Sequence, residues 1–137
     1  MPRSSSFALG LCLALSLGCA NQWRDINAES FSDATVEVED HVAAGAPRRD
    51  ELLGLIDDGF VAAWERRVGL IEALGFTLTA RTTVQDGQIS PDELQQLRDR
   101  ATVFFAAPVT PERRAEVLAF KAAVDARRRV ELRALAR

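Results

Sequence analysis

Two helix starts in the second half of the sequence constrain its fold more than any other feature. The segment 89–94, Ile-Ser-Pro-Asp-Glu-Leu, places a serine N-cap before a proline at the first helical position, with a glutamate three residues after the cap. Thr110-Pro111-Glu112 repeats this chemistry, and Pro108 ends the helix between the two starts. The two starts predict a helical hairpin. Its first helix has a core face of five residues: Leu94, Leu97, Ala101, Phe104 and Phe105.

A longer helix is predicted before this hairpin, from about Arg48 to Leu74. Apolar residues recur there at intervals of three and four, which places them on one helical face. Gly75 is the expected end of the helix, and the threonine-rich stretch 76–84 is expected to be a short strand or an extended connection. The predicted fold class is therefore all-α, a small three-helix domain over residues 47–137 made of one long helix plus a helical hairpin. The expected core face of the long helix is Leu53, Ile56, Phe60, Trp64, Val68 and Ile71.

The first residues have the composition of a targeting segment rather than of a folded domain. Arg3 gives a positive start, and residues 7–17 are uncharged and rich in Leu and Ala. This apolar run is shorter than the roughly 20 residues that a membrane-spanning helix needs. Both cysteines, Cys12 and Cys19, lie in this segment, so cleavage before Cys19 would leave no second thiol for a disulfide.

The sequence Leu15-Ser16-Leu17-Gly18-Cys19 resembles the lipobox of bacterial lipoproteins. The resemblance implies cleavage before Cys19, acylation of its thiol and anchoring in a membrane of the cell envelope. Ala20 replaces the aspartate that retains such proteins in the inner membrane, which implies the periplasmic face of the outer membrane in a Gram-negative cell. An ordinary secretory signal or a plain membrane anchor is the alternative. The chain is thus divided into a lipoprotein signal peptide (1–18), a lipidated N-terminus with a flexible acidic linker (19–46), and the helical domain.

Charge is unevenly distributed along the rest of the chain. Residues 20–60 contain ten acids and three arginines, whereas residues 61–137 contain ten acids and thirteen bases. Two explanations are open: complementarity within the molecule, or binding of an anionic surface by the second half. The final helix ends in an arginine cluster, for which we predict contact with anionic lipid headgroups or an acidic partner, a solvated helix end being the alternative. This cluster is Arg127, Arg128, Arg129, Arg133 and Arg137.

The sequence offers no constellation of catalytic residues. His41 is the single histidine and lies in the expected linker, so neither a hydrolase triad nor a transition-metal centre is predicted. Residues 86–94 resemble the second half of an EF-hand calcium loop. However, Thr82 and Val84 occupy ligand positions that require acidic or amide oxygens, and a capped helix start explains the same residues. We expect no enzyme activity, no cofactor, no metal and no nucleic-acid partner.

One further resemblance concerns the helix starts themselves. Residues 109–113, Val-Thr-Pro-Glu-Arg, and more weakly residues 89–93, resemble the repeat openings of the periplasmic LTxxQ family. Proteins of that family are all-α and cradle partners without cofactors. The sequence therefore predicts a non-catalytic, lipid-anchored cell-envelope protein that acts as a binding or structural module, with a protein partner in the envelope. A periplasmic chaperone or stress-response accessory is the alternative, and a degenerate EF-hand protein is less favoured.

Overall fold

A computed structural model describes residues 3–105 and 108–137 of the chain, with side chains from residue 22 onward. The described residues form five α-helices and no strand, so the all-α prediction is confirmed while the three-helix description is replaced by five helices. None of these helices contains a stretch that is long and apolar enough to cross a membrane. The helices are α1 (Arg3–His41), α2 (Arg49–Trp64), α3 (Leu70–Thr83), α4 (Pro91–Phe104) and α5 (Pro111–Leu135).

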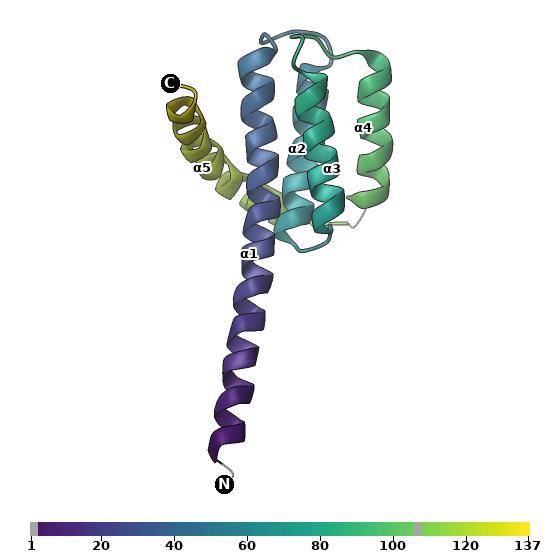
Figure 1. Ribbon diagram of the computed structural model, residues 1–137. Helices are drawn as coiled ribbons and strands as arrows, with labels where there is room; N and C mark the ends of the chain where they lie inside the picture. Colours follow the sequence, from purple (N-terminus) through teal and green to yellow (C-terminus); the bar gives the residue numbers. More distant parts are fainter. Residues whose placement is uncertain (1–2, 106–107) are drawn as a thin grey trace.

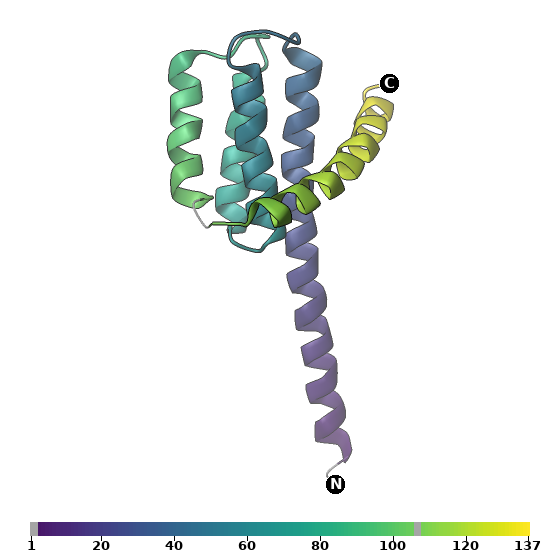
Figure 2. The ribbon, with the colours of Figure 1, turned by 180° about the vertical axis from the view of Figure 1, so that it is seen from behind.

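Helices α1 to α4 form an up-and-down bundle, and α5 lies outside it (Figure 1). Helices α2 and α3 pack between α1 on one side and α4 on the other. Helix α5 crosses the end of the bundle and packs on α1 and α2, on the side of α1 that faces away from α4 (Figures 1 and 2). The N-terminal half of α1 extends beyond the bundle.

The second half of α1 supplies one wall of the core. Ala28, Phe31, Ala34 and Val38 recur at intervals of three and four, and all four are buried. The interpretation of this stretch as a flexible acidic linker is therefore wrong from residue 22 to residue 41. The acids between the apolar positions suggested a solvated segment, but in the structure they face basic residues that lie far along the chain.

The expected long helix is divided in two at Arg66. This residue adopts a left-handed conformation, with φ of 59°. The amide of Arg66 donates to the carbonyl of Ala63 and that of Arg67 to the carbonyl of Ala62, which is the Schellman pattern that ends a helix. The sequence did not reveal this break because glycine usually occupies the left-handed position, and the nearest glycine is Gly69.

Helix α3 replaces the expected strand or connection, and Gly75 lies within it rather than at a helix end. Its threonines satisfy their hydroxyl groups within the helix: Thr79 Oγ1 donates to the carbonyl of Gly75 at 2.8 Å, and Thr83 Oγ1 to that of Thr79 at 2.8 Å. Threonine disfavours helices only weakly, and packing against α1 and α4 outweighs that preference. The shifted helix exposes Ile71, which we had expected in the core.

Both predicted helix starts are confirmed, but the predicted hairpin is wrong: among the described residues α5 makes no contact with α4 and packs on α1 and α2 instead. The Ser90 hydroxyl accepts a hydrogen bond from the amide of Glu93 at 3.1 Å, and the Thr110 hydroxyl accepts one from the amide of Arg113 at 3.2 Å. Leu94, Leu97 and Ala101 are buried as expected, and α4 ends at Phe104, before Pro108.

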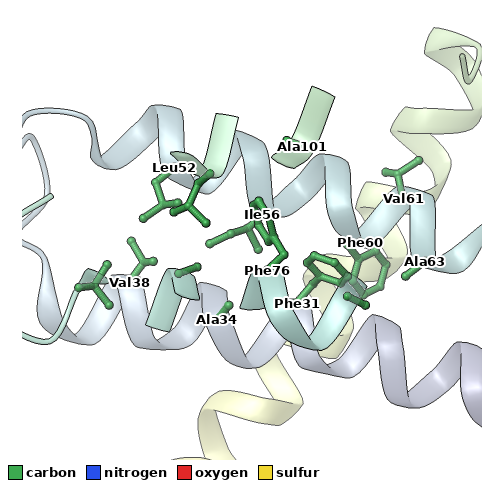
Figure 3. Close-up of a cluster of buried hydrophobic side chains, with 14 of the residues drawn as sticks. Phe31, Ala34, Val38, Leu52, Ile56, Phe60, Val61, Ala63, Phe76 and Ala101 are labelled. Atoms are coloured by element: carbon green, nitrogen blue, oxygen red, sulfur yellow. The ribbon is translucent and has the colours of Figure 1, made fainter. Parts of the chain in front are cut away.

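The Phe31 ring of α1 lies against the backbone of α2 at Gly59, and Figure 3 shows this side chain in the buried cluster beside Phe60 and Phe76. A Cβ atom on Gly59 would lie 2.1 Å from Cε1 of Phe31, so only glycine fits there. The Phe31 ring also contacts Phe76 at 6.0 Å and Phe105 at 5.6 Å between ring centroids. These rings hold Phe31 from behind, so it cannot move aside for a larger residue in α2.

Gly59→Ala is expected to destabilise the protein by about 2 kcal/mol, because the new methyl group overlaps a ring that is fixed on its other sides. Gly54 lies in the same helix with open space around its Cα, so Gly54→Ala is the matched control. The control should stabilise the protein by about 0.5–1 kcal/mol through helix propensity alone. Urea denaturation of the two variants measures both effects. If both substitutions changed the free energy of unfolding in the same direction, the close contact between Gly59 and Phe31 would be contradicted.

Candidate functional site

Helix α5 is held on α1 by a row of ion pairs, which we call the α1–α5 seam. Arg128 donates to both carboxylate oxygens of Asp33 at 2.6 and 3.1 Å, and Arg129 donates to both oxygens of Glu39 at 2.7 Å. Bidentate pairs of this kind fix geometry as well as adding energy. Two more exposed pairs flank them: Arg127 with Glu29 at 3.5 Å and Arg133 with Asp40 at 3.1 Å.

The seam accounts for four of the five arginines that we predicted to contact an anionic surface. Their partners are the acids of the first half of the chain, so the uneven charge is matched within the molecule. Arg137 lies exposed after the end of α5. The four paired guanidinium groups would have to leave these carboxylates before they could bind another anion, although the side chains of Arg127 and Arg133 are more than half exposed.

Lys121 lies next to the seam, where α5 packs on both α1 and α2, and is 3% exposed. Its Nζ is 2.8 Å from Asp125 Oδ2, 3.0 Å from Asp57 Oδ1 and 2.9 Å from Thr35 Oγ1, so its three donors reach three oxygens. The other oxygen of Asp125, Oδ1, is buried without a hydrogen-bond partner in the described part of the chain. The charge of Lys121 thus compensates for the burial of Asp125. Lys121 is not among the residues predicted from the sequence, although a lysine that shares a helical face with the apolar residues Val117 and Val124 is a signal for such a site.

Beside the seam, a cleft of about 360 Å³ opens between α1, α2 and α5. Its aromatic wall consists of Phe60, Trp64 and Phe120, and the Trp64 and Phe120 rings lie 4.5 Å apart. The Arg24 guanidinium lies 4.0 Å from the centroid of the Trp64 ring, and Arg127 also lines the cleft. Trp64, expected in the core, packs against it and also lines this cleft. The arrangement can hold an apolar or aromatic group, whereas both arginines are already paired with acids of the lining, Arg24 with Asp25 and Arg127 with Glu29.

The residues that carry the EF-hand resemblance serve local structure before and at the start of α4. Asp86 Oδ1 accepts from the amide of Gln88 at 3.0 Å, and Glu93 Oε1 accepts from the Ser90 hydroxyl at 2.9 Å. The only two strong calcium ligands that the EF-hand resemblance offered are thus engaged in a turn and a helix cap. Across residues 22–105 and 108–137, no group of three or more His, Cys, Asp or Glu side chains is arranged to hold a metal ion.

Comparison with known proteins gives no match for this chain among family models, curated proteins or solved structures. The fold and the site therefore define it only as a small helical-bundle protein with an ion-paired fifth helix. Cys19, the predicted acylation site, belongs to the part of α1 whose side chains lie outside the described residues.

Removing Lys121 is expected to cost far more stability than removing an exposed seam arginine. Lys121→Met leaves Asp125 buried without its counter-ion, which typically costs on the order of 3–5 kcal/mol. Arg133→Met, the matched control, breaks an exposed pair and should cost about 1 kcal/mol or less. Chemical denaturation at pH 7 measures both. If both variants lost the same small amount of stability, the buried cluster around Lys121 would contribute little to the free energy of unfolding.

Glu39 makes the stability of the seam dependent on pH. Its hydrogen bonds with Arg129 hold the pKa of Glu39 below the ordinary value of 4.5. A carboxyl group with a depressed pKa contributes stability above its unfolded pKa, and this contribution is lost as the pH falls through the folded pKa. Glu39→Gln should therefore be less stable than the wild type at pH 7, and the difference should shrink below pH 4.5.

Thermal unfolding of both proteins between pH 3 and pH 7 measures this difference. An Arg129→Gln background provides the control, since Glu39→Gln should have little effect on stability once its partner is absent. A difference that stays constant over the whole pH range would contradict the assignment.

Proposed function

We propose that this chain is a lipid-anchored protein of the cell envelope whose helical domain acts as a non-catalytic binding or structural module. The observation that carries the proposal is the sequence Leu15-Ser16-Leu17-Gly18-Cys19 at the end of an uncharged apolar run. Acylation of Cys19 would tether the domain to a membrane. In a Gram-negative cell, Ala20 favours the periplasmic face of the outer membrane.

The course of α1 supports a short and rigid tether. From residue 22 onward this helix leads directly into the core, where Phe31 is fully buried. A domain attached in this way remains close to the bilayer, whereas a flexible linker of two dozen residues would let it move away. Such a placement suits a module that presents a surface at the membrane.

The cleft between α1, α2 and α5 is the surface that we assign to a protein partner. It combines aromatic side chains, which dominate binding energy in protein interfaces, with arginines at its rim. Phe120 is about half exposed there. A partner segment with an apolar or aromatic side chain has the chemistry that fits this cleft.

Metabolic labelling with a fatty-acid analogue tests the anchor. The wild-type chain should incorporate the label, and Cys19→Ser should abolish it, because the thiol is the site of acylation. Cys12→Ser is the matched control, since it removes the other cysteine of the same segment and should leave labelling unchanged. A wild type that incorporates no label, or a Cys19→Ser variant that still does, would refute the proposal.

A further inference from the structure

The outward side of α3 has the composition of a buried helix, although it is exposed. Ile71 is 82% exposed and Leu78 is 59% exposed, and Leu74 between them is also exposed. No charged residue occurs from 73 to 80. A helix that is apolar all round normally packs against protein or lipid on every side, yet α3 packs only on α1, α2 and α4.

Exposed apolar residues of α1 lie level with those of α3, so this surface continues onto α1. The two helices run in the same direction, and the Phe31 and Phe76 rings meet at 6.0 Å between centroids. Residues five positions earlier, Ile26 and Ile71, therefore lie at the same height along the bundle. Ile26 is 43% exposed and Trp23, almost one turn before it, is 51% exposed.

An ion pair marks the upper end of this surface. Glu37 on α1 pairs with Arg81 on α3 at 3.2 Å, on the outer side of the contact between the two helices. Ile26 precedes Glu37 by eleven residues and Leu74 precedes Arg81 by seven, so helical periodicity places both below this pair. Ile26 also precedes Asp33 by seven residues, so it lies at the border between this surface and the α1–α5 seam. The resulting surface, which we call the α1–α3 apolar face, consists of Trp23, Ile26, Ile71, Leu74 and Leu78.

We propose that the α1–α3 apolar face docks on the lipid bilayer beside the anchor, with α1 and α3 lying along the membrane surface. This inference rests on the proposed function, because Trp23 follows the acylated Cys19 by four residues, a rise of about 6 Å in a helix. The anchor would therefore hold the face against the headgroups whenever the acyl chains are inserted. Tryptophan and large aliphatic side chains are the types found on helices that lie in the interface.

The charge of the molecule favours a hydrophobic contact over an electrostatic one. The chain has a net charge of −3, and four arginines at the end of α5 are paired within the α1–α5 seam. Helix α3, which carries three of the five residues of this face, does not contact α5 and lies on the other side of the bundle from it (Figures 1 and 2). We therefore expect docking on uncharged phosphatidylcholine membranes, with little dependence on salt.

Spin labels on the lipidated full-length protein in phosphatidylcholine vesicles test this docking. Cleavage before an acylated Cys19 leaves no free thiol, so Ile71→Cys and Leu78→Cys each provide a single labelling site. Val130→Cys on α5 is the matched control, because Val130 is an apolar residue of similar exposure, 72%, outside the apolar face. Paramagnetic relaxation by oxygen, which enters lipid, and by a nickel complex, which stays in water, reports the surroundings of each label.

The labels at positions 71 and 78 should lose access to the nickel complex and gain access to oxygen, while the label at position 130 stays in water. Leu78→Glu should return the position 71 label to water, and Val130→Glu should not. Equal access to the nickel complex at all three positions would overturn the docking. Dipolar broadening between position 78 labels would also overturn it, by showing that a second copy covers the face.

Mass spectrometry of the same samples separates this inference from the proposed anchor. An acylated protein whose labels all remain in water refutes the docking alone. A protein without acyl groups refutes the anchor, and the docking with it.

Discussion

The contact of Phe31 with Gly59 sets the geometry on which the rest of the bundle depends. Because Gly59 has no side chain, α1 and α2 approach closely enough for the Phe31 ring to lie between them. The same ring meets Phe76 of α3 and Phe105 at the end of α4, so one side chain contacts residues from three other elements. Such a ring fixes the register of all four helices at once, which explains why helices with glycines and many threonines pack into a defined bundle.

Helix α5 is attached by a different kind of interaction. Its last buried apolar residue is Val124, and beyond it the contact with α1 consists of charge pairs. Each exposed pair contributes little to the free energy of unfolding. In the buried Lys121–Asp125 pair, removing one residue destabilises the protein strongly because the other charge then stays buried without a partner. The seam therefore specifies where α5 lies more than it adds to overall stability. It also leaves the aromatic cleft open between α5 and the bundle.

Local chemistry in the sequence predicted the two capped helix starts, whereas the packing of α5 on α1 and α2 instead of α4 depends on long-range pairing that the sequence did not reveal. Ser90 and Thr110 were found because an N-cap is a signal within a few residues. The break at Arg66 was missed because its left-handed position lacks the usual glycine. The buried half of α1 was predicted to be a linker because its many acidic residues suggested a solvated segment, despite the helical spacing of its apolar residues. The arginines that pair with these acids lie about ninety residues away in the sequence. The arginines themselves were identified correctly as a cluster, but the sequence offers no way to choose between an internal and an external acid.

The two sides of α1 thus have opposite chemistry, which bears on where a membrane contact can form. On one side its acids neutralise the arginines of α5, so the positive charge most able to attract anionic headgroups is already used. On the other side α1 and α3 expose aliphatic and aromatic side chains without any charge between residues 73 and 80. If the arginines were free, the charged side would compete for the bilayer through attraction over about 10 Å at moderate salt. Because the arginines are paired with the acids of α1, this competition is absent. The proposed docking then depends on apolar contact through the α1–α3 apolar face alone.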